Sequence, residues 1–263
     1  MATPEEDLAL ALELADVADA ITLERFHAED LIVETKPDMT PVTEADRAVE
    51  QALRERLATL HPGDSIVGEE YGAGPAAGSR RRWIIDPIDG TKSYVRGVPV
   101  WATLLALEQD GELTVGVASA PALGRRWWGL RGGGAFVRDG LSTEPRRLGV
   151  SAISELGDAQ LCFAGFEEWQ ETGRLGSLIE LGAQCWRTRG YGDFWQYMLV
   201  AEGVLEIAID PVASLWDLAA PLLVVQEAGG RFTDLAGRAG ADGGDALATN
   251  GLLHDAALAF VGR

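Results

Sequence analysis

An apolar segment that leads directly into two carboxylates constrains this chain more than any other feature. It reads Trp83-Ile-Ile-Asp-Pro-Ile-Asp-Gly-Thr91. The apolar residues predict a buried strand, and Asp86 and Asp89 flank a proline-containing turn at its end. Two unneutralised carboxylates held close together repel each other, whereas a divalent cation would bind both, and hard oxygen ligands suit Mg²⁺. The alternative is an Asx turn followed by a helix cap. That interpretation would be preferred for a lone Asp-Pro, but the whole string favours the metal site.

The last residues of the string predict an anion site beside the cation. Gly90 and Thr91 would expose backbone N–H groups at the start of a short helix, capped by Asp89 or Thr91, and such a place favours a phosphate. Asp46 and Asp217 also stand at predicted helix starts, where the simplest interpretation is a helix cap.

Composition narrows the class of protein. The chain has 263 residues, 47% of them hydrophobic, and a formal net charge of −19. Such a chain is globular, and its acidity argues against nucleic acid as a partner and favours metal ions or cationic small molecules. The chain has only two cysteines, and its acidic start lacks the basic region of a signal peptide. No apolar run approaches the roughly 20 residues that a membrane helix needs. We therefore expect a cytoplasmic protein without a membrane span.

Hydrophobic periodicity predicts a β-rich half followed by an α/β half, with a boundary near 145–155. In the first half we expect helices at 5–27 and from about 46 to His61, and antiparallel strands at 101–108, 113–119 and 126–130. In the second half we expect strands at 161–164, 186–189, 205–209 and 231–233, and helices at 169–182, 194–202 and 218–228.

Four strings in this order and spacing resemble the inositol monophosphatase superfamily, which comprises Mg²⁺-dependent, lithium-sensitive phosphomonoesterases. They are Gly68-Glu-Glu70, Trp83 to Thr91, Trp216-Asp-Leu-Ala219 and Glu227-Ala-Gly-Gly230. A closer resemblance is to the histidinol-phosphate phosphatase branch of actinobacteria. It rests on strings such as Thr35-Lys-Pro-Asp38, Gly97-Val-Pro-Val-Trp101, Arg125-Arg-Trp-Trp128 and Tyr191-Gly-Asp-Phe194.

The resemblance implies an α/β (α+β) fold, a layered αβαβα sandwich built from two fused subdomains. Residues 1–148 would form an N-terminal α+β subdomain with most metal ligands. Residues 149–263 would form a C-terminal α/β subdomain with Asp217 and the substrate-side residues. The resemblance also implies a homodimer and two to three Mg²⁺ ions per site.

The resemblance also assigns roles to single residues. The implied metal ligands are Glu69, Asp86, the backbone carbonyl of Ile88, Asp89 and Asp217. Glu69 would hold the metal that activates water, Thr91 would orient that water, and Asp46 would pair with the threonine. The implied phosphate and substrate contacts are Ile88, Asp89, the amides of Gly90 and Thr91, Arg187, Asp210 and Asp217.

These residues fit metal-assisted in-line displacement on a small phosphate monoester, without a covalent enzyme intermediate. Histidinol phosphate carries an amine and an imidazole, so its site should offer acids beyond the metal ligands. Asp193 and Asp210 are the candidates, with Tyr191 and Trp195 as stacking partners for the ring, although Asp193 could equally cap the helix after it. The three histidines are expected to be solvated.

Two other functions stay open at this point. An inositol-1-monophosphatase or a broad sugar-phosphate phosphatase would use the same chemistry with hydroxyl partners in the pocket. A non-catalytic metal-binding regulatory protein is a more distant alternative.

Overall fold

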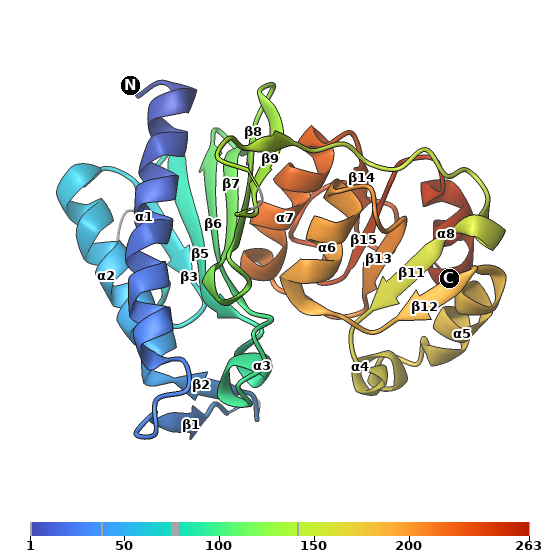
Figure 1. Ribbon diagram of the computed structural model, residues 1–263, viewed down its shortest axis with the longest axis horizontal. Helices are drawn as coiled ribbons and strands as arrows, with labels where there is room; N and C mark the ends of the chain where they lie inside the picture. Colours follow the sequence, from blue (N-terminus) through green and yellow to red (C-terminus); the bar gives the residue numbers. More distant parts are fainter. Residues whose placement is uncertain (1, 38, 75–78, 141, 263) are drawn as a thin grey trace.

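The computed structural model describes residues 2–37, 39–74, 79–140 and 142–262. Figure 1 shows five layers, in which two sheets alternate with three layers of helices. The outer helices on one side are α1 (Pro4–Arg25) and α2 (Glu44–Leu60), the central ones α6 (Asp193–Ala201) and α7 (Leu215–Glu227), and those on the other side α4 (Phe166–Glu171), α5 (Leu175–Gln184) and α8 (His254–Val261). The predicted αβαβα sandwich is confirmed. Asp38, in the expected turn 35–38, lies outside the described residues.

The first sheet has eight strands in the order β10-β9-β8-β7-β6-β5-β3-β4. Their bounds are β3 (Ser65–Gly68), β4 (Gly72–Ala73), β5 (Arg81–Asp89), β6 (Ala102–Gln109), β7 (Glu112–Ala120), β8 (Arg125–Leu130), β9 (Gly134–Arg138) and β10 (Arg146–Arg147). Only β3 and β5 are parallel among these pairs of described strands. Asp110 and Gly111 both have positive φ, as the predicted tight hairpin between β6 and β7 requires.

The second sheet has five strands in the order β12-β11-β13-β15-β14. Their bounds are β11 (Gln160–Phe163), β12 (Arg187–Arg189), β13 (Ile207–Asp210), β14 (Arg231–Thr233) and β15 (Ala246–Thr249). Smaller elements are β1 (Val33–Thr35), β2 (Pro41–Thr43), α3 (Thr91–Val95) and the 3₁₀ turns η1 (Pro121–Leu123) and η2 (Leu156–Asp158). All strands of the second sheet therefore follow those of the first sheet in the sequence.

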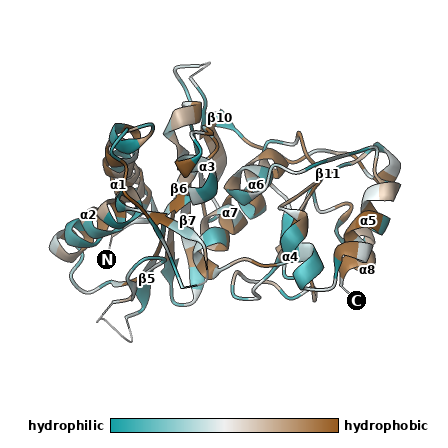
Figure 2. Ribbon diagram, turned by 90° about the horizontal axis from the view of Figure 1, so that it is seen from below, coloured by the Kyte–Doolittle hydropathy of each residue, from teal (hydrophilic) through white to brown (hydrophobic). Residues whose placement is uncertain are grey.

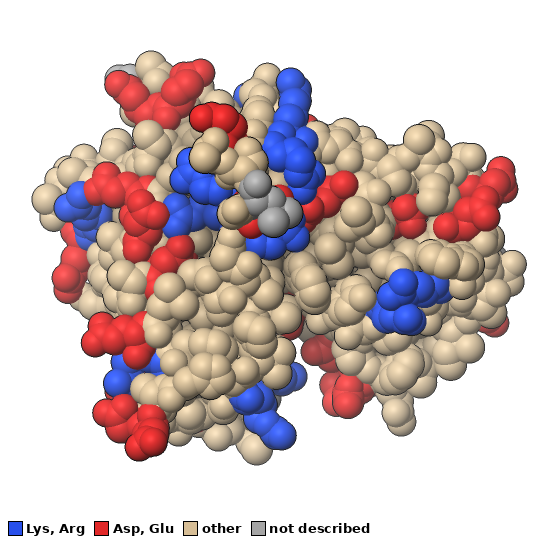
Figure 3. All heavy atoms as spheres, viewed as in Figure 1, with Lys and Arg blue, Asp and Glu red and all other residues tan. Residues whose placement is uncertain are grey.

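The helices cover the sheets with their apolar sides, which are brown in Figure 2. Successive residues of β5 pack into different cores, because side chains alternate between the two faces of a strand. Trp83 and Ile85 pack with α1 and α2, whereas Ile84 packs with α6 and α7. Charged side chains of both signs are spread over the face shown in Figure 3.

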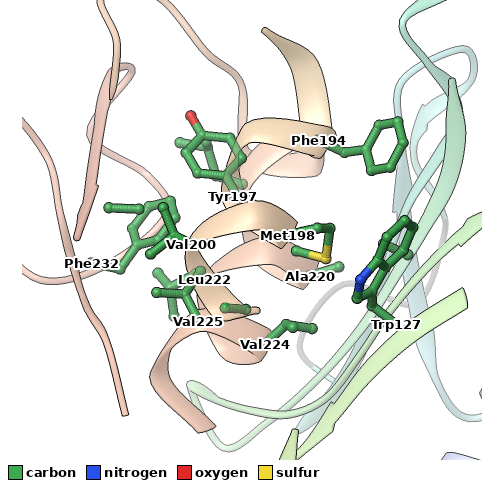
Figure 4. Packing of buried hydrophobic residues seen from close by; sticks show 14 of the residues in the cluster. Trp127, Phe194, Tyr197, Met198, Val200, Ala220, Leu222, Val224, Val225 and Phe232 are labelled. Atoms are coloured by element: carbon green, nitrogen blue, oxygen red, sulfur yellow. The ribbon is translucent and has the colours of Figure 1, made fainter. Parts of the chain in front are cut away.

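The central core is the largest cluster and joins the two sheets. Trp127 of β8, Phe194 and Met198 of α6, and Val224 of α7 meet there (Figure 4). The expected boundary at residues 148 and 149 falls between β10 and β11. This one core therefore includes residues from both halves of the chain.

Three local predictions need correction. The predicted helix 169–182 is broken into α4 and α5 at Gly173, whose φ of 72° ends the first helix. The helix α3 is capped by Gly90 without a side-chain hydrogen bond, and not by Asp89 or Thr91. His254 is fully buried rather than solvated, between the hydroxyls of Thr233 and Thr249. Among the described residues, no helix combines the length and apolar character needed to cross a membrane.

Candidate functional site

The end of β5 brings its two acids together through a bulge. From Asp86 to Asp89 the strand advances three residues, whereas its partner β6 advances two, from Leu104 to Ala102. In a regular strand, residues three apart point to opposite faces. The extra residue of the bulge removes that alternation. The predicted turn between the two acids is therefore wrong in form, since the strand continues through it.

A third acid arrives from the other half of the chain. Asp217 is the third residue of α7, and its Oδ2 accepts a 2.7 Å hydrogen bond from the backbone N–H of Ser214. This capping box fixes the side chain at the helix start. Asp86, Asp89 and Asp217 each offer a carboxylate oxygen, and these oxygens lie within 4.8 Å of one another. Asp217 was expected as the N-cap, a position that Ser214 takes.

The electrostatics of this cluster favour a cation. Burial and the surrounding carboxylates raise the pKa values of Asp86 and Asp89 well above their usual range, and burial raises the pKa of Asp217 to about 6. Oδ1 of Asp86 is buried without a hydrogen-bond partner among the described residues. A hard divalent ion such as Mg²⁺ would supply both the missing partner and the missing charge. The residues present thus fit the predicted metal.

Glu69 follows β3, the parallel neighbour of β5, and its backbone N–H donates to the carbonyl of Ile85. Its carboxylate accepts a 2.6 Å hydrogen bond from Nζ of Lys36, which also contacts Glu70 at 2.6 Å. Glu50, a buried residue of α2, accepts the backbone N–H of Glu70 at 2.7 Å. The buried carboxylate of Glu50 therefore fixes the backbone directly after Glu69.

Asp46 and Thr91 lie side by side. Oδ1 of Asp46 is 3.3 Å from the hydroxyl of Thr91, which also lies 2.9 Å from the carbonyl of Ile88. The other oxygen, Oδ2, accepts the N–H and the hydroxyl of Thr43 at 2.8 and 2.6 Å. Thr43, not Asp46, is the N-cap of α2. Burial raises the pKa of Asp46 to about 6.

Two adjoining cavities lie at the three clustered aspartates, and one of them also reaches Glu69 and Thr91. The outer one has a volume of about 320 Å³ and contains most of the predicted site. It is lined by Thr40, Pro41, Glu69, Asp86, Ile88, Asp89, Gly90, Thr91, Lys92, Glu168, Asp193, Val212, Ala213, Ser214, Trp216 and Asp217. The inner one measures about 140 Å³ and shares part of this lining with Ala164, Phe194, Tyr197 and Asp210.

Asp193 and Asp210 both line the inner cavity. Asp193 is the first residue of α6 and has a φ of 49°, in the left-handed region that aspartate tolerates better than most residues. Gln196 and Tyr197 each donate a hydrogen bond to Oδ2 of Asp210, at 2.6 and 2.5 Å, while its Oδ1 is buried without a partner among the described residues. Burial raises the pKa of Asp193 to about 6 and that of Asp210 to about 7.

Of the predicted residues, Asp46 lines neither cavity but contacts Thr91, and three others lie elsewhere. Arg187 of β12 lines neither cavity. Tyr191 and Trp195 also line neither; their rings contact each other with centroids 4.9 Å apart and pack against the central core. The structure therefore does not bring these three side chains together with the acids.

Sequence reasoning missed two charged residues of the site. Lys92 stands directly after Thr91 and lines the outer cavity, and Glu168 of α4 lines both cavities. Lys92 carried a signal, because it is one of only two lysines in the chain and adjoins the predicted phosphate cradle. Glu168 carried none, since it sits in an ordinary amphipathic stretch between Glu167 and Trp169.

Comparison with known proteins agrees with this geometry. The sequence model of the inositol monophosphatase family matches residues 3–260. The histidinol-phosphatase of Streptomyces coelicolor is 53% identical over 98% of this chain and 97% of the relative. That of Mycobacterium tuberculosis is 56% identical over 96% of each chain. The extragenic suppressor protein suhB of Bartonella henselae superposes with a TM-score of 0.87 at 27% identity, covering 96% of this chain and 97% of that one.

Proposed function

The chain belongs to the inositol monophosphatase family, and from this premise we propose that it is a Mg²⁺-dependent phosphomonoesterase that hydrolyses L-histidinol phosphate to L-histidinol and phosphate in histidine biosynthesis. The observation that carries the chemistry is the convergence of Asp86, Asp89 and Asp217 at the floor of a cavity. High identity to two histidinol-phosphatases over nearly the whole chain supports the substrate.

Metal ions in this site would neutralise phosphate oxygens and the leaving alkoxide and would lower the pKa of a water molecule. Asp86, Asp89, Asp217, Glu69 and the carbonyl of Ile88 are the proposed ligands, for two to three Mg²⁺ ions. Nζ of Lys36 forms an ion pair with the carboxylate of Glu69 at 2.6 Å.

The protein's own groups position the attack. We assign to Thr91 the orientation of the attacking water, because its hydroxyl stands between Asp46 and the carbonyl of Ile88. The carboxylate of Asp46 would receive the proton, since burial raises its pKa to about 6, in the range useful for proton transfer near neutral pH. The backbone N–H groups of Gly90 and Thr91 would hold the phosphate.

The inner cavity supports a cationic substrate. Asp193 and Asp210 line it, and the buried Oδ1 of Asp210, which has no partner among the described residues, can accept a hydrogen bond from an imidazole N–H. Inositol phosphate offers no positive charge to either acid. Arg187 stays a proposed substrate-side residue on the strength of the resemblance alone.

Three further assignments are proposals of the same kind. A homodimer is what the family resemblance suggests. A cytoplasmic location rests on the low cysteine content. Two fused subdomains, 1–148 and 149–263, rest on the separation of the two sheets along the sequence.

The test is a substrate panel. Phosphate release from L-histidinol phosphate and from inositol 1-phosphate is measured with Mg²⁺ and with EDTA. We expect Mg²⁺-dependent turnover with a clear preference for histidinol phosphate. A preference for inositol 1-phosphate would show that the proposed substrate is wrong. No phosphate release from any monoester would point to the metal-binding regulatory alternative.

A further inference from the structure

One acid of the site has no part in the chemistry described so far. Glu168 lies on α4, outside both sheets, and lines the outer and the inner cavity. The exposed Glu167 beside it lines neither. Burial raises the pKa of the Glu168 carboxyl, although the ammonium of Lys92 opposes this.

The charge of the inner cavity is one-sided. Its described lining has five acids and no lysine, arginine or histidine; the acids are Asp89, Glu168, Asp193, Asp210 and Asp217. Mg²⁺ would neutralise Asp89 and Asp217 but leave the other three. Lys92, in the outer cavity, attracts both Asp193 and Glu168. The charge of one lysine thus acts on two acids, and Oδ1 of Asp210 has no hydrogen-bond partner in the part of the chain that the structure describes.

The order of groups along histidinol phosphate matches the order of the cavities. Its amine sits on the carbon between the phosphate-bearing carbon and the ring-bearing carbon. A phosphate at Thr91 in the outer cavity and an imidazole at Asp210 in the inner cavity therefore place the amine where the cavities adjoin. Four acids line both cavities and so border this junction; Asp89 and Asp217 are proposed metal ligands, which leaves Glu168 and Asp193 for the amine.

We propose that Glu168 is a specificity-determining residue that receives the ammonium group of the substrate at the junction of the two cavities. This inference rests on the proposed function and deepens it. In the free protein the positive charge of Lys92 favours the ionised carboxylates of Glu168 and Asp193. The substrate's ammonium takes over that role when it binds, which ties affinity to the presence of the amine.

The experiment compares two esters and two adjacent acids. The esters are L-histidinol phosphate and its des-amino analogue, 3-(imidazol-4-yl)propyl phosphate. We expect Glu168→Gln to lower kcat/KM for histidinol phosphate about tenfold, mainly through KM, because a charge-assisted hydrogen bond is lost. With the des-amino analogue, the same variant should stay within about twofold of the wild type, because the lost partner is absent there.

Glu167→Gln is the matched control and should leave both substrates unchanged, while Glu168→Asp should recover part of the loss. Thermal melting of each variant reports folding separately. Equal loss on both esters, or none on either, would overturn the role of Glu168. If the wild type hydrolyses neither ester, the proposed function itself fails and this inference with it.

Discussion

The backbone N–H of Phe194 donates a 2.5 Å hydrogen bond to Oδ2 of Asp89. This bond joins the first turn of α6 to the last residue of β5, across the boundary between the two halves of the sequence. It leaves the other oxygen of Asp89 for a cation. It also places Asp193, the residue before Phe194, beside the cluster of aspartates rather than in solvent.

Asp193→Asn should separate substrate choice from chemistry. Asparagine tolerates the positive φ of Asp193, so the backbone of α6 should persist. Loss of the charge removes a contact to a cationic substrate worth about 1.5–3 kcal/mol, or about ten- to a hundredfold in kcat/KM. We expect that loss with histidinol phosphate and less than about a twofold change with inositol 1-phosphate. Equal losses on both would show that Asp193 does not select the substrate.

Asp86→Asn should lower activity and yet raise the stability of the metal-free protein. Among the residues that the structure describes, the buried Oδ1 of Asp86 has no hydrogen-bond partner, and the carboxylates of Asp89 and Asp217 lie close to that of Asp86. Removing its charge relieves that repulsion, whereas catalysis loses a proposed ligand and at least about a hundredfold in kcat. Thermal melts with EDTA and with Mg²⁺ measure both effects. Asp242→Asn, at an exposed position, is the control. A Mg²⁺-induced rise in Tm as large as that of the wild type would argue against a ligand role for Asp86.

Thr91→Val should impair the chemical step rather than binding. The variant keeps the backbone N–H of residue 91 and loses the hydroxyl between Asp46 and the carbonyl of Ile88. We expect a fall of about a hundredfold in kcat with KM nearly unchanged, and substantial recovery in Thr91→Ser. Steady-state kinetics decide this. Thr91→Val as active as the wild type would show that the hydroxyl has no part in the chemical step, and Thr91→Ser as inactive as Thr91→Val would show that the hydroxyl alone does not support it.

The features that could be predicted from the sequence are those encoded locally. Alternating apolar residues around Gln109-Asp-Gly111 were enough for the hairpin of β6 and β7, because a turn and its flanking strands are neighbours in sequence. The string from Trp83 to Thr91 was informative for a similar reason. Its strand, its acids and the helix after it are all short-range features.

The features that could not be predicted depend on distant parts of the chain. The bulge after Asp86 arises in pairing with β6; Pro87 is typical of a bulge, but the shift in register depends on the partner strand. Glu168 acquires its place only when α4 packs beside the inner cavity. His254 looked like a solvated helix-end residue, yet β14 and β15 bury it. Local propensity says little about such tertiary placements.

His254 should make the protein less stable at acid pH. Burial lowers its pKa to about 4, so the folded state keeps it neutral while the unfolded state protonates it below about 6.5. The unfolded state then binds more protons, and the free energy of unfolding falls between pH 6.5 and 4, by up to about 3 kcal/mol from this residue. The raised pKa values of the site acids act in the opposite direction.

The comparison of wild type with His254→Gln isolates the histidine from those acids. Glutamine can still bond to one of the threonine hydroxyls, so the variant should fold with reduced stability at pH 7.5. The stability gap between the two proteins should narrow as the pH is lowered towards 4.5, as measured by urea unfolding at several pH values. A gap independent of pH would show that His254 titrates normally in the folded state.

The close packing of α7 on the first sheet gives a prediction about stability alone. A Cβ on Gly116 of β7 would lie 2.8 Å from the carbonyl oxygen of Ala220, which belongs to the α7 backbone and has little freedom to move. Gly116→Ala should therefore cost about 1–3 kcal/mol and lower Tm by several degrees. Gly176→Ala is the matched control, because a Cβ there meets nothing within 4 Å and alanine favours the helix α5. It should leave Tm unchanged or raise it. A Gly116→Ala protein as stable as the wild type would mean that α7 can move away from the sheet. Asp217 would then move with α7, and the Mg²⁺-dependent activity should change.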